Sequence, residues 1–270
     1  MPELPEVETA RRGIAPLVSG RRVVSVDIRN PHLRWPVPET LAEVCGQVLT
    51  HVRRRAKYLL LPAQTGTIIL HLGMSGSLRV VPERTPPGRY DHVDFLLDHR
   101  QRLRLRDPRR FGCVLWVRTD PEQHPLLKAL GPEPLSGAFS GAYLHRRARD
   151  RDVAIKAFIM DSKTVGGVGN IYASEALFKS GIHPHRPAGR IALKRYVRLA
   201  DAIKETLTEA IAAGGTTLRD FTRESGRPGY FRTQLLVYGR HGEPCPRCTT
   251  PIQRRVIGQR SSFLCPRCQR

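Results

Sequence analysis

Four cysteines near the end of the chain constrain its fold more than any other feature of the sequence. They form two Cys-x-x-Cys pairs separated by sixteen residues: Cys245, Cys248, Cys265 and Cys268. This spacing is typical of a zinc site in which each pair supplies two thiolates to one tetrahedral ion. Four thiolates leave no open coordination position, so we expect one structural Zn²⁺ ion. Disulfide bonds are the less favoured alternative, because the sequence shows no export signal.

The segment between the two cysteine pairs is basic. Residues Ile252–Phe263 have the pattern of a β-hairpin, and we expect Arg254, Arg255 and Arg260 to project from it. A basic hairpin fixed by zinc is well suited to contact nucleic acid. On these residues alone, a transcription factor or a ribosomal protein would fit equally well.

The overall charge also indicates a polyanionic partner. Lys and Arg number 45 against 24 Asp and Glu, which gives a net charge of +21. Arginine-rich usage explains why arginine replaces lysine, but it does not explain the shortage of acidic residues. Nucleic acid is favoured over a membrane surface because no amphipathic basic segment is visible. No segment reads as a bilayer span or a signal peptide, so we expect a soluble, cytoplasmic protein without membrane partners.

The first half of the chain predicts an antiparallel β-sandwich or barrel. After a helix at the start, short apolar or alternating segments follow one another, separated by turns that contain Gly and Pro. Cys45 and Cys113 lie isolated in this region, and we expect both to be buried. The expected strands are 23–28, 48–61, 67–72, 77–81, 93–97, 103–105 and 114–117, with a second helix near 39–45.

The pattern changes near Leu130–Leu135, where Gly and Pro indicate an interdomain hinge. Beyond it the apolar period becomes helical, over 153–160, 170–178 and 193–213. We therefore expect an α+β multidomain fold. Its parts are an N-terminal β-sandwich flanked by helices (residues 1–130), a helical domain (131–236) and a zinc-finger β-hairpin (237–270).

The first residues of the chain include candidates for catalysis. Removal of the initiator methionine would leave Pro2 as a free secondary amine with a pKa of about 8, partly neutral at pH 7. Such an amine can attack a sugar carbon and form a Schiff base. Glu3 beside it is a candidate acid, and Pro5 is expected to begin a helix with Glu6 in its first turn. On these residues alone, a capped helix without chemical function is the favoured interpretation.

A glycine-rich turn, Thr164–Asn170, precedes a predicted helix. Glycines at such a place let backbone N–H groups approach a phosphate, and Asn170 could cap the helix or donate to the anion. No nucleotide cofactor is expected, because no Gly-Lys-Ser/Thr follows. An ordinary turn between helices explains the glycines about as well. In so basic a chain, a DNA phosphate is the favoured anion.

Several stretches together resemble those of bacterial formamidopyrimidine-DNA glycosylases, in order along the whole chain. Endonuclease VIII relatives share the Pro-Glu start and the zinc finger, but they differ in most of the other stretches and therefore come second. The resemblance implies that the helical domain is of the helix–two-turns–helix type. The matching stretches are Met1–Thr9, Arg55–Tyr58, His71–Leu78, Asp107–Gly112, Val165–Glu175 and the cysteine module.

The resemblance implies base-excision repair. The family excises oxidised purines, chiefly 8-oxoguanine and formamidopyrimidines, from duplex DNA and then cleaves the abasic strand by β- and δ-elimination. Pro2 would attack C1′ and form the Schiff base, and Glu3 would donate and shuttle protons. Lys57 is matched to a proton donor and phosphate contact, and Arg260 to the δ-elimination step. Glu6 is matched to the pocket for the damaged base.

The resemblance also implies a set of DNA contacts. Met74, Arg109 and Phe111 would fill the void left by the flipped nucleotide. Tyr90 stands where the family often has a histidine. Residues 216–234 match a loop that closes over the flipped base. The residues matched to DNA contacts are Met74, Tyr90, Arg109, Phe111, Arg151 and Asn170, the last two to phosphates.

We therefore expect a monomeric, bifunctional DNA glycosylase and AP lyase that acts on damaged double-stranded DNA in the bacterial cytoplasm, associated with the nucleoid. One alternative is an endonuclease VIII-like glycosylase for oxidised pyrimidines. Another is a non-catalytic zinc-finger DNA-binding protein. The Pro2–Glu3 pair and Lys57 favour an enzyme, because a pure binding protein has no need of a free terminal amine.

Overall fold

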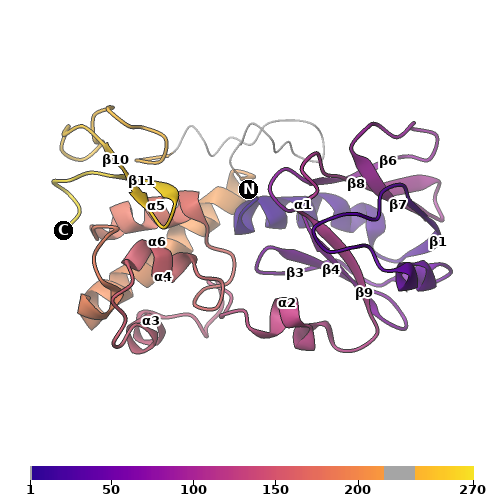
Figure 1. Ribbon diagram of the computed structural model, residues 1–270, viewed down its shortest axis with the longest axis horizontal. Coiled ribbons are helices and arrows are strands. Elements are labelled where there is room, and N and C mark those ends of the chain that lie inside the picture. Colours follow the sequence, from indigo (N-terminus) through magenta and orange to yellow (C-terminus); the bar gives the residue numbers. More distant parts are fainter. Residues whose placement is uncertain (1, 216–234) are drawn as a thin grey trace. The chain divides into compact units, whose positions relative to one another are not determined.

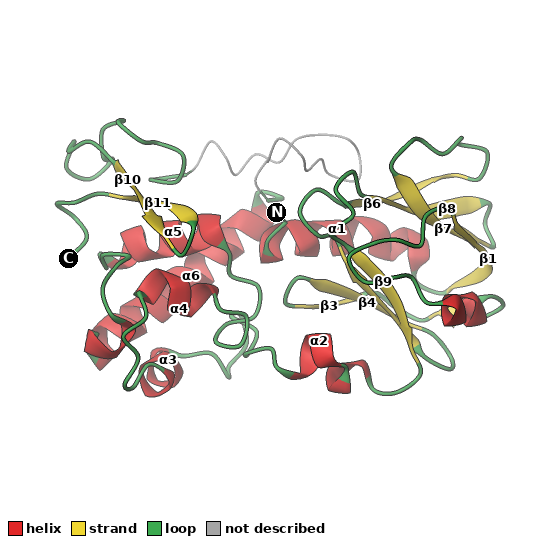
Figure 2. Cartoon of the chain, in the orientation of Figure 1, coloured by secondary structure: helices red, strands yellow, loops and turns green. Residues whose placement is uncertain are grey.

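Most of the strands lie in the first half of the chain and most of the α-helices in the second (Figure 2). The computed structural model describes residues 2–215 and 235–270 (Figure 1). The chain forms two compact units, Met1–Lys128 with Gly214–Tyr230 and Ala129–Ala213 with Phe231–Arg270. Within the described residues, no helix is long and apolar enough to cross a membrane.

Helix α1 (Leu4–Val18) begins at the predicted place and for the predicted reason. Pro5 lies in its first turn, where the missing N–H group costs nothing. Glu3 is the N-cap, and it forms a capping box with Glu6 that satisfies backbone donors at the helix start. Residues spaced three and four apart bury one side of the helix: Leu4, Val7, Ala10, Ile14 and Val18.

The strands of the first unit form two antiparallel sheets. Their orders are β2-β1-β7-β8-β6 and β3-β4-β5-β9. The strands are β1 (Arg21–Ile28), β2 (Val48–Leu49), β3 (Arg53–Arg55), β4 (Tyr58–Pro62), β5 (Thr67–His71), β6 (Ser77–Pro82), β7 (Asp91–Leu97), β8 (Gln101–Arg106) and β9 (Cys113–Val117).

Both sheets and α1 contribute to one apolar core, which includes Ile14, Leu70 and Phe95. Helix α1 packs against β6 of one sheet and against β3 and β4 of the other. The predicted β-sandwich is therefore confirmed, and α1 contacts both of its sheets.

Two details of the prediction for this unit are wrong. The expected strand 48–61 is three strands, β2, β3 and β4, and the chain turns back between β3 and β4 at Ala56, whose φ is +51°. Cys45 is exposed, because it ends a short 3₁₀ helix (Glu39–Val44) at the surface instead of lying in a strand. Cys113, at the start of β9, is buried as expected.

The second unit is helical. The expected segments 153–160, 170–178 and 193–213 correspond to α4, α5 and α6, and α5 ends at Gly181 with φ +71°. A pair of turns joins α4 to α5. Two short helices had no signal in the sequence: α2, in the first unit, and α3. The helices are α2 (Pro125–Lys128), α3 (Gly141–Arg147), α4 (Ile155–Met160), α5 (Asn170–Ser180) and α6 (Leu193–Ala212), with 3₁₀ turns at Pro121–Gln123 and Ala188–Arg190.

The expected C-terminal hairpin is present as β10 (Gln253–Ile257) and β11 (Arg260–Leu264). It closes a small apolar cluster that includes Phe178 of α5, Ile252 and Phe263. Two of the four motif cysteines, Cys245 and Cys265, belong to the same cluster. The zinc module therefore packs onto α5 within the second unit.

Candidate active site and nucleic-acid surfaces

Pro2 and Glu3 are buried at the start of α1. The backbone N–H of Glu3 donates to Oε2 of Glu6 at 2.8 Å, and the Glu6 side chain is fully buried. Gly215, with φ +80°, lies against this carboxylate, since a Cβ there would be 3.1 Å from Glu6 Oε1. Hydrogen bonding fixes the backbone immediately after Pro2. The helix start therefore holds Pro2 beside the side chain of the N-cap residue, Glu3.

Lys57 lies on the tight turn between β3 and β4, and a pair of charged residues ties this turn to α1. Arg54 donates from Nη1 to the carbonyl of Ala56 at 2.9 Å and from Nε to Oε2 of Glu8 at 3.2 Å. Burial favours a higher pKa for Glu8, but its arginine partners, Arg11 first, hold that pKa below the usual value. This contact between Glu8 and Arg54 has no signal in the sequence.

Met74 lies on the loop between β5 and β6, residues 72–76, which we call the Met74 loop. Nδ1 of His71 accepts from the N–H of Gly73 at 2.9 Å, and the N–H of Gly76 donates to the carbonyl of Leu72 at 2.8 Å. Ser75 is buried and Met74 half-buried. The loop is thus a defined turn, and Met74 lies at its tip.

Arg109 and Phe111 lie on the loop between β8 and β9, residues 107–112, which we call the Arg109 loop. Both side chains are exposed, and the Arg109 guanidinium lies 4.8 Å from the centre of the Phe111 ring. This loop touches the Met74 loop, because a Cβ on Gly73 would lie 2.5 Å from Gly112 N. The structure therefore brings together the two loops that carry Met74, Arg109 and Phe111.

Tyr90 lies immediately before β7 in a basic environment. The guanidinium carbons of Arg89 and Arg106 lie 5.4 Å and 5.6 Å from the centre of its ring. Its carbonyl accepts from the N–H of Asp107 at 2.9 Å. The first unit thus joins Tyr90 to the Arg109 loop and surrounds its ring with positive charge.

The pH dependence of stability should report on the His71 hydrogen bond. Burial first, and then the charges of Lys57 and Arg34, lower the pKa of His71 from 6.5 to about 4. The unfolded chain therefore binds this proton between pH 6.5 and 4 while the folded chain does not, so the free energy of unfolding falls as pH decreases across this interval. The variant His71→Gln keeps a hydrogen-bond acceptor that does not titrate. We expect its melting temperature to fall less than that of the wild-type protein as the pH decreases from 6.5 to 4. An equal loss in both proteins, measured by calorimetry, would contradict this assignment.

Asn170 opens helix α5 in the second unit, but it does not cap it. Gly169 is the N-cap, so the capping alternative is wrong. The Asn170 Nδ2 donates to the hydroxyl of Tyr238 at 3.2 Å and to the carbonyl of Ser261 at 3.1 Å. Arg151 is exposed on the turn after α3. Within the second unit, Asn170 is therefore tied to the strand that carries Arg260, which is itself exposed at the start of β11.

Two buried charged residues, Glu175 and Lys156, attach the zinc module to the helices. Neither contact has a signal in the sequence. The Glu175 carboxylate of α5 accepts from the backbone N–H groups of residues 236, 237 and 238 at 2.8–3.0 Å. Its burial raises its pKa, which these hydrogen bonds partly offset. Lys156 of α4 donates from Nζ to the hydroxyl of Ser262 at 2.8 Å and to the carbonyl of Ser261 at 3.1 Å.

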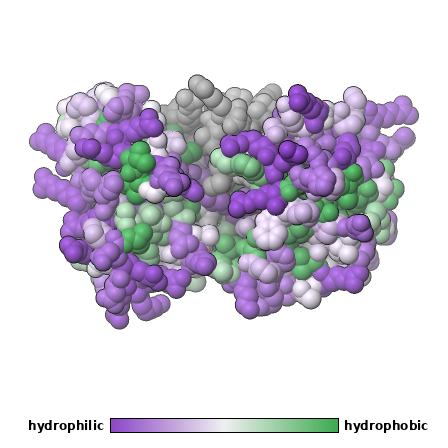
Figure 3. All heavy atoms as spheres, viewed as in Figure 1, coloured by the Kyte–Doolittle hydropathy of each residue, from purple (hydrophilic) through white to green (hydrophobic). Residues whose placement is uncertain are grey.

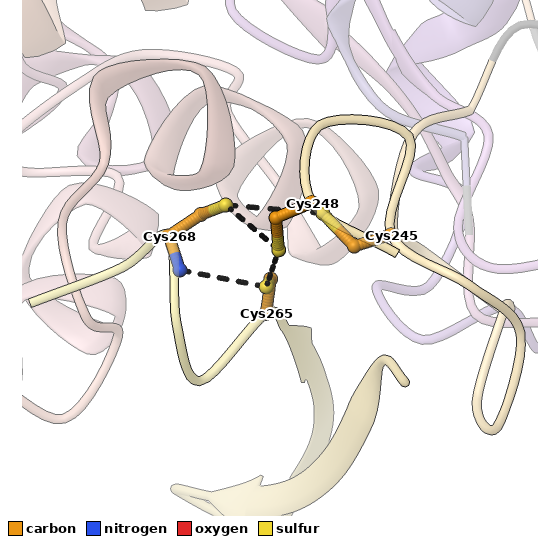
Figure 4. A group of neighbouring side chains, drawn as sticks. All are labelled: Cys245, Cys248, Cys265 and Cys268. Carbon is orange, nitrogen blue, oxygen red and sulfur yellow. Dashed lines mark hydrogen bonds between the residues drawn. The ribbon is translucent and has the colours of Figure 1, made fainter. Parts of the chain in front are cut away.

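The four motif cysteines meet in one cluster (Figure 4). Their Sγ atoms all lie within 4.8 Å of one another, with the pair Cys245–Cys268 at 3.9 Å and Cys248–Cys265 at 3.4 Å. A tetrahedral Zn²⁺ with Zn–S bonds of about 2.3 Å places its sulfurs about 3.8 Å apart. The N–H groups of Arg247 and Cys268 point at two of the sulfurs, at 3.4 Å each. The donor set therefore fits one structural zinc ion.

Hydrophilic side chains predominate on the face of each unit shown in Figure 3. Within the first unit the candidate residues are Pro2, Glu3, Glu6, Lys57, Met74, Tyr90, Arg109 and Phe111, and within the second Arg151, Asn170, Arg260 and the four cysteines. The predicted loop 216–234 lies outside the described residues.

Known proteins match the chain along its whole length. Three family models match in order: the formamidopyrimidine-DNA glycosylase N-terminal domain (residues 1–114), the formamidopyrimidine-DNA glycosylase H2TH domain (residues 130–222) and a zinc finger found in FPG and IleRS (residues 242–270). A formamidopyrimidine-DNA glycosylase of Syntrophotalea carbinolica is 60% identical over 271 residues, covering 100% of both chains.

Solved structures with the same fold contain damaged DNA. The Lactococcus lactis Fpg bound to DNA with an abasic site has a TM-score of 0.91 and 31% identity, covering 100% of both chains. The same enzyme bound to DNA containing Fapy-dG has a TM-score of 0.90 and 31% identity, covering 99% of this chain and 100% of that one.

Proposed function

The chain belongs to the formamidopyrimidine-DNA glycosylase family, and from this membership we propose which residues carry out each step of its reaction. It is a base-excision repair enzyme, a DNA glycosylase with AP-lyase activity that removes oxidised purines from damaged double-stranded DNA. It holds one structural zinc ion. The endonuclease VIII-like alternative is not favoured.

Pro2 is the nucleophile in our proposal. Its neutral secondary amine attacks C1′ of the damaged nucleotide, the glycosidic C–N bond breaks, and the base leaves with a proton. Glu3 donates a proton to the sugar ring oxygen as the ring opens and the Schiff base forms. The observation that carries this proposal is the buried helix start, which fixes the carboxylate of Glu3 next to Pro2.

The Schiff base is also the basis of strand cleavage. It withdraws electrons from C2′, so loss of a C2′ proton expels the 3′ phosphate, and a second elimination expels the 5′ phosphate. We propose that Lys57 acts as a proton donor and phosphate contact near the damaged nucleotide. Arg260 of the hairpin assists the second elimination, and Glu6 contributes to the pocket for the lesion.

The remaining candidate residues bind DNA in our proposal. Met74, Arg109 and Phe111 occupy the void left by the flipped nucleotide, where an apolar wedge offsets part of the lost stacking. Arg109 donates to the orphaned cytosine. The phosphate contacts are Tyr90, Arg151 and Asn170.

We propose three functional domains: residues 1–130 for catalysis, 131–236 for DNA binding by the helices, and 237–270 for DNA binding by the zinc hairpin. The protein acts as a monomer. We propose that it works in the bacterial cytoplasm, held at the nucleoid by its affinity for DNA.

Borohydride trapping tests the proposed function. The protein is incubated with a duplex carrying 8-oxoguanine opposite cytosine, and an undamaged duplex is the control. We expect strand cleavage with β- and δ-elimination products and a covalent adduct that peptide mass spectrometry maps to Pro2. A thymine glycol duplex serves as a competing substrate. Preference for that duplex would favour the endonuclease VIII-like alternative, and binding without adduct or cleavage would overturn the enzyme assignment.

A further inference from the structure

Asp107, the first residue of the Arg109 loop, has a fully buried carboxylate. Its Oδ2 accepts from the N–H of Gly112 at 2.8 Å, and its Oδ1 accepts from the N–H of Arg109 at 3.2 Å. Oδ1 also accepts from the hydroxyl of Ser75, on the Met74 loop, at 3.3 Å. One side chain therefore contacts both loops that carry the void-filling residues.

The backbone of Asp107 is held as firmly as its side chain. Its N–H donates to the carbonyl of Tyr90 at 2.9 Å. Its carbonyl accepts from Nε2 of the buried His92 at 2.8 Å and from the N–H of Arg110 at 3.2 Å. These bonds fix the carboxylate relative to β7 and β8, so the two loops are held against a rigid sheet.

Three hydrogen-bond donors from the two loops satisfy this buried carboxylate. Among the described residues, no arginine or lysine side chain pairs with Asp107, although buried carboxylates normally require a cation or several donors. Each of these donors to the carboxylate oxygens lies on one of the two loops. Hydrogen bonds to a charged acceptor are about twice as strong as hydrogen bonds between neutral groups. The three hydrogen bonds to Asp107 therefore stabilise the arrangement in which both loops contact its carboxylate.

Close packing at Gly112 supports the same conclusion. A Cβ at this position would lie 2.5 Å from the carbonyl oxygen of His71 and 3.1 Å from Asp107 Oδ2. Glycine at position 112 therefore allows the end of the Arg109 loop to approach both the carboxylate and the end of β5. The Arg109 loop therefore packs closely against the end of β5, where the Met74 loop begins.

We propose that Asp107 is a positioning residue that holds the Met74 and Arg109 loops as one unit, so that Met74, Arg109 and Phe111 enter the duplex together. The inference rests on the proposed function. It assigns Asp107 to the extrusion step, in which the damaged nucleotide leaves the stack, and gives it no part in the reaction of Pro2 with C1′.

This assignment distinguishes duplex from single-stranded substrates. In a single-stranded abasic oligonucleotide there is no orphaned base to contact and no stacked duplex to open. Loss of Asp107 should therefore impair excision from a duplex much more than Schiff-base formation on a single-stranded abasic site. A residue needed only for folding would impair both to the same degree.

The test uses Asp107→Asn, which keeps the size of the side chain but turns one acceptor into a donor facing backbone N–H groups. We expect single-turnover excision of 8-oxoguanine from a duplex to slow by about tenfold to a hundredfold, as for other small misplacements of positioning groups. Borohydride trapping on a single-stranded abasic oligonucleotide should change less than about twofold, well below that effect. Asp98→Asn is the matched control, because Asp98 also accepts a backbone N–H, that of Arg22, but at a distant turn.

A second readout reports on Arg109 directly. The Asp107→Asn protein should lose part of its discrimination between cytosine and adenine opposite the lesion. Combination with Arg109→Ala should cost less than the sum of the two single effects, because both act on the same contact. If Asp107→Asn melts too low for assay, Ser75→Ala removes one of the three hydrogen bonds and should show a smaller loss of the same kind.

Two outcomes would overturn the inference: an equal loss on duplex and single-stranded substrates, or an unchanged rate on the duplex. Failure of the proposed function is a different result. In that case the wild-type protein itself would give no borohydride adduct with either substrate.

Discussion

Protein that retains its initiator methionine is expected to form no Schiff base. With Met1 in place the Pro2 nitrogen is an amide, whose lone pair is delocalised into the carbonyl and is not nucleophilic. Excision and strand cleavage both pass through this nitrogen, so both should fall by at least about a thousandfold, as is usual when an enzyme loses its nucleophile. DNA binding should persist, because the proposed contacts to phosphates and to the void do not involve the amine.

The measurement compares the same protein before and after removal of Met1. Protein made by cell-free synthesis with methionine aminopeptidase inhibited is assayed before and after treatment with that aminopeptidase. We expect borohydride adducts with 8-oxoguanine duplex to appear only after treatment, in proportion to the fraction of chains that mass spectrometry shows to begin at Pro2. An adduct formed by the untreated chain would place the nucleophile elsewhere, and Lys57 would then be the first residue to examine.

The residues with the strongest chemistry were accessible from the sequence because their signals are local. The cysteine pairs carry their ligand spacing within a few residues, and the helix start at Pro5 follows from a fixed preference of proline. The alternating strands of the sandwich and the stripe of α6 are likewise periodic over short windows. Local signals of this kind gave the fold class and the zinc site, both of which the structure confirms.

The supporting contacts could not be predicted, because their partners are far apart in the chain. Glu8 and Arg54 are 46 residues apart, and Glu175 lies 61 residues from Leu236. In the Asp-Pro-Arg-Arg-Phe-Gly stretch, the resemblance assigns DNA contacts only to Arg109 and Phe111. The carboxylate of Asp107, which binds Ser75 across 32 residues, had no signal of its own. Such a role is visible only when the partners are brought together.

Cys45 and Asn170 show the opposite limit, where a local signal was misleading. Apolar neighbours suggested burial for Cys45, but the chain ends a 3₁₀ helix there and the thiol faces solvent. Asn170 has a side chain that often caps helices. Gly169 is the N-cap instead, and the amide of Asn170, the first residue of the helix, contacts Tyr238 and the hairpin. The position of Cys45 at the surface and the tertiary contacts of Asn170 are not encoded in the residues next to them.

Replacement of Cys248 by serine should remove the zinc ion and, with it, the fold of the hairpin. The apolar cluster under the module is small, consisting chiefly of Phe178, Val237, Ile252 and Phe263. A core of this size does not fold unaided, and structural zinc contributes about 10–16 kcal/mol in isolated zinc-finger peptides. We expect metal content to fall from one equivalent to none. Affinity for a duplex with an abasic-site analogue should fall about a hundredfold, which corresponds to about 2.8 kcal/mol.

The chain supplies its own control, since Cys45 is an exposed cysteine outside the cluster. Cys45→Ser should keep one equivalent of zinc by inductively coupled plasma mass spectrometry and bind the same duplex with unchanged affinity. The rest of the second unit should stay folded in Cys248→Ser, because α5 and α6 pack on each other without the module. Its helical circular dichroism should therefore be retained while the affinity is lost. Retention of both metal and affinity would show that three thiolates are sufficient, and the four-thiolate assignment would be wrong.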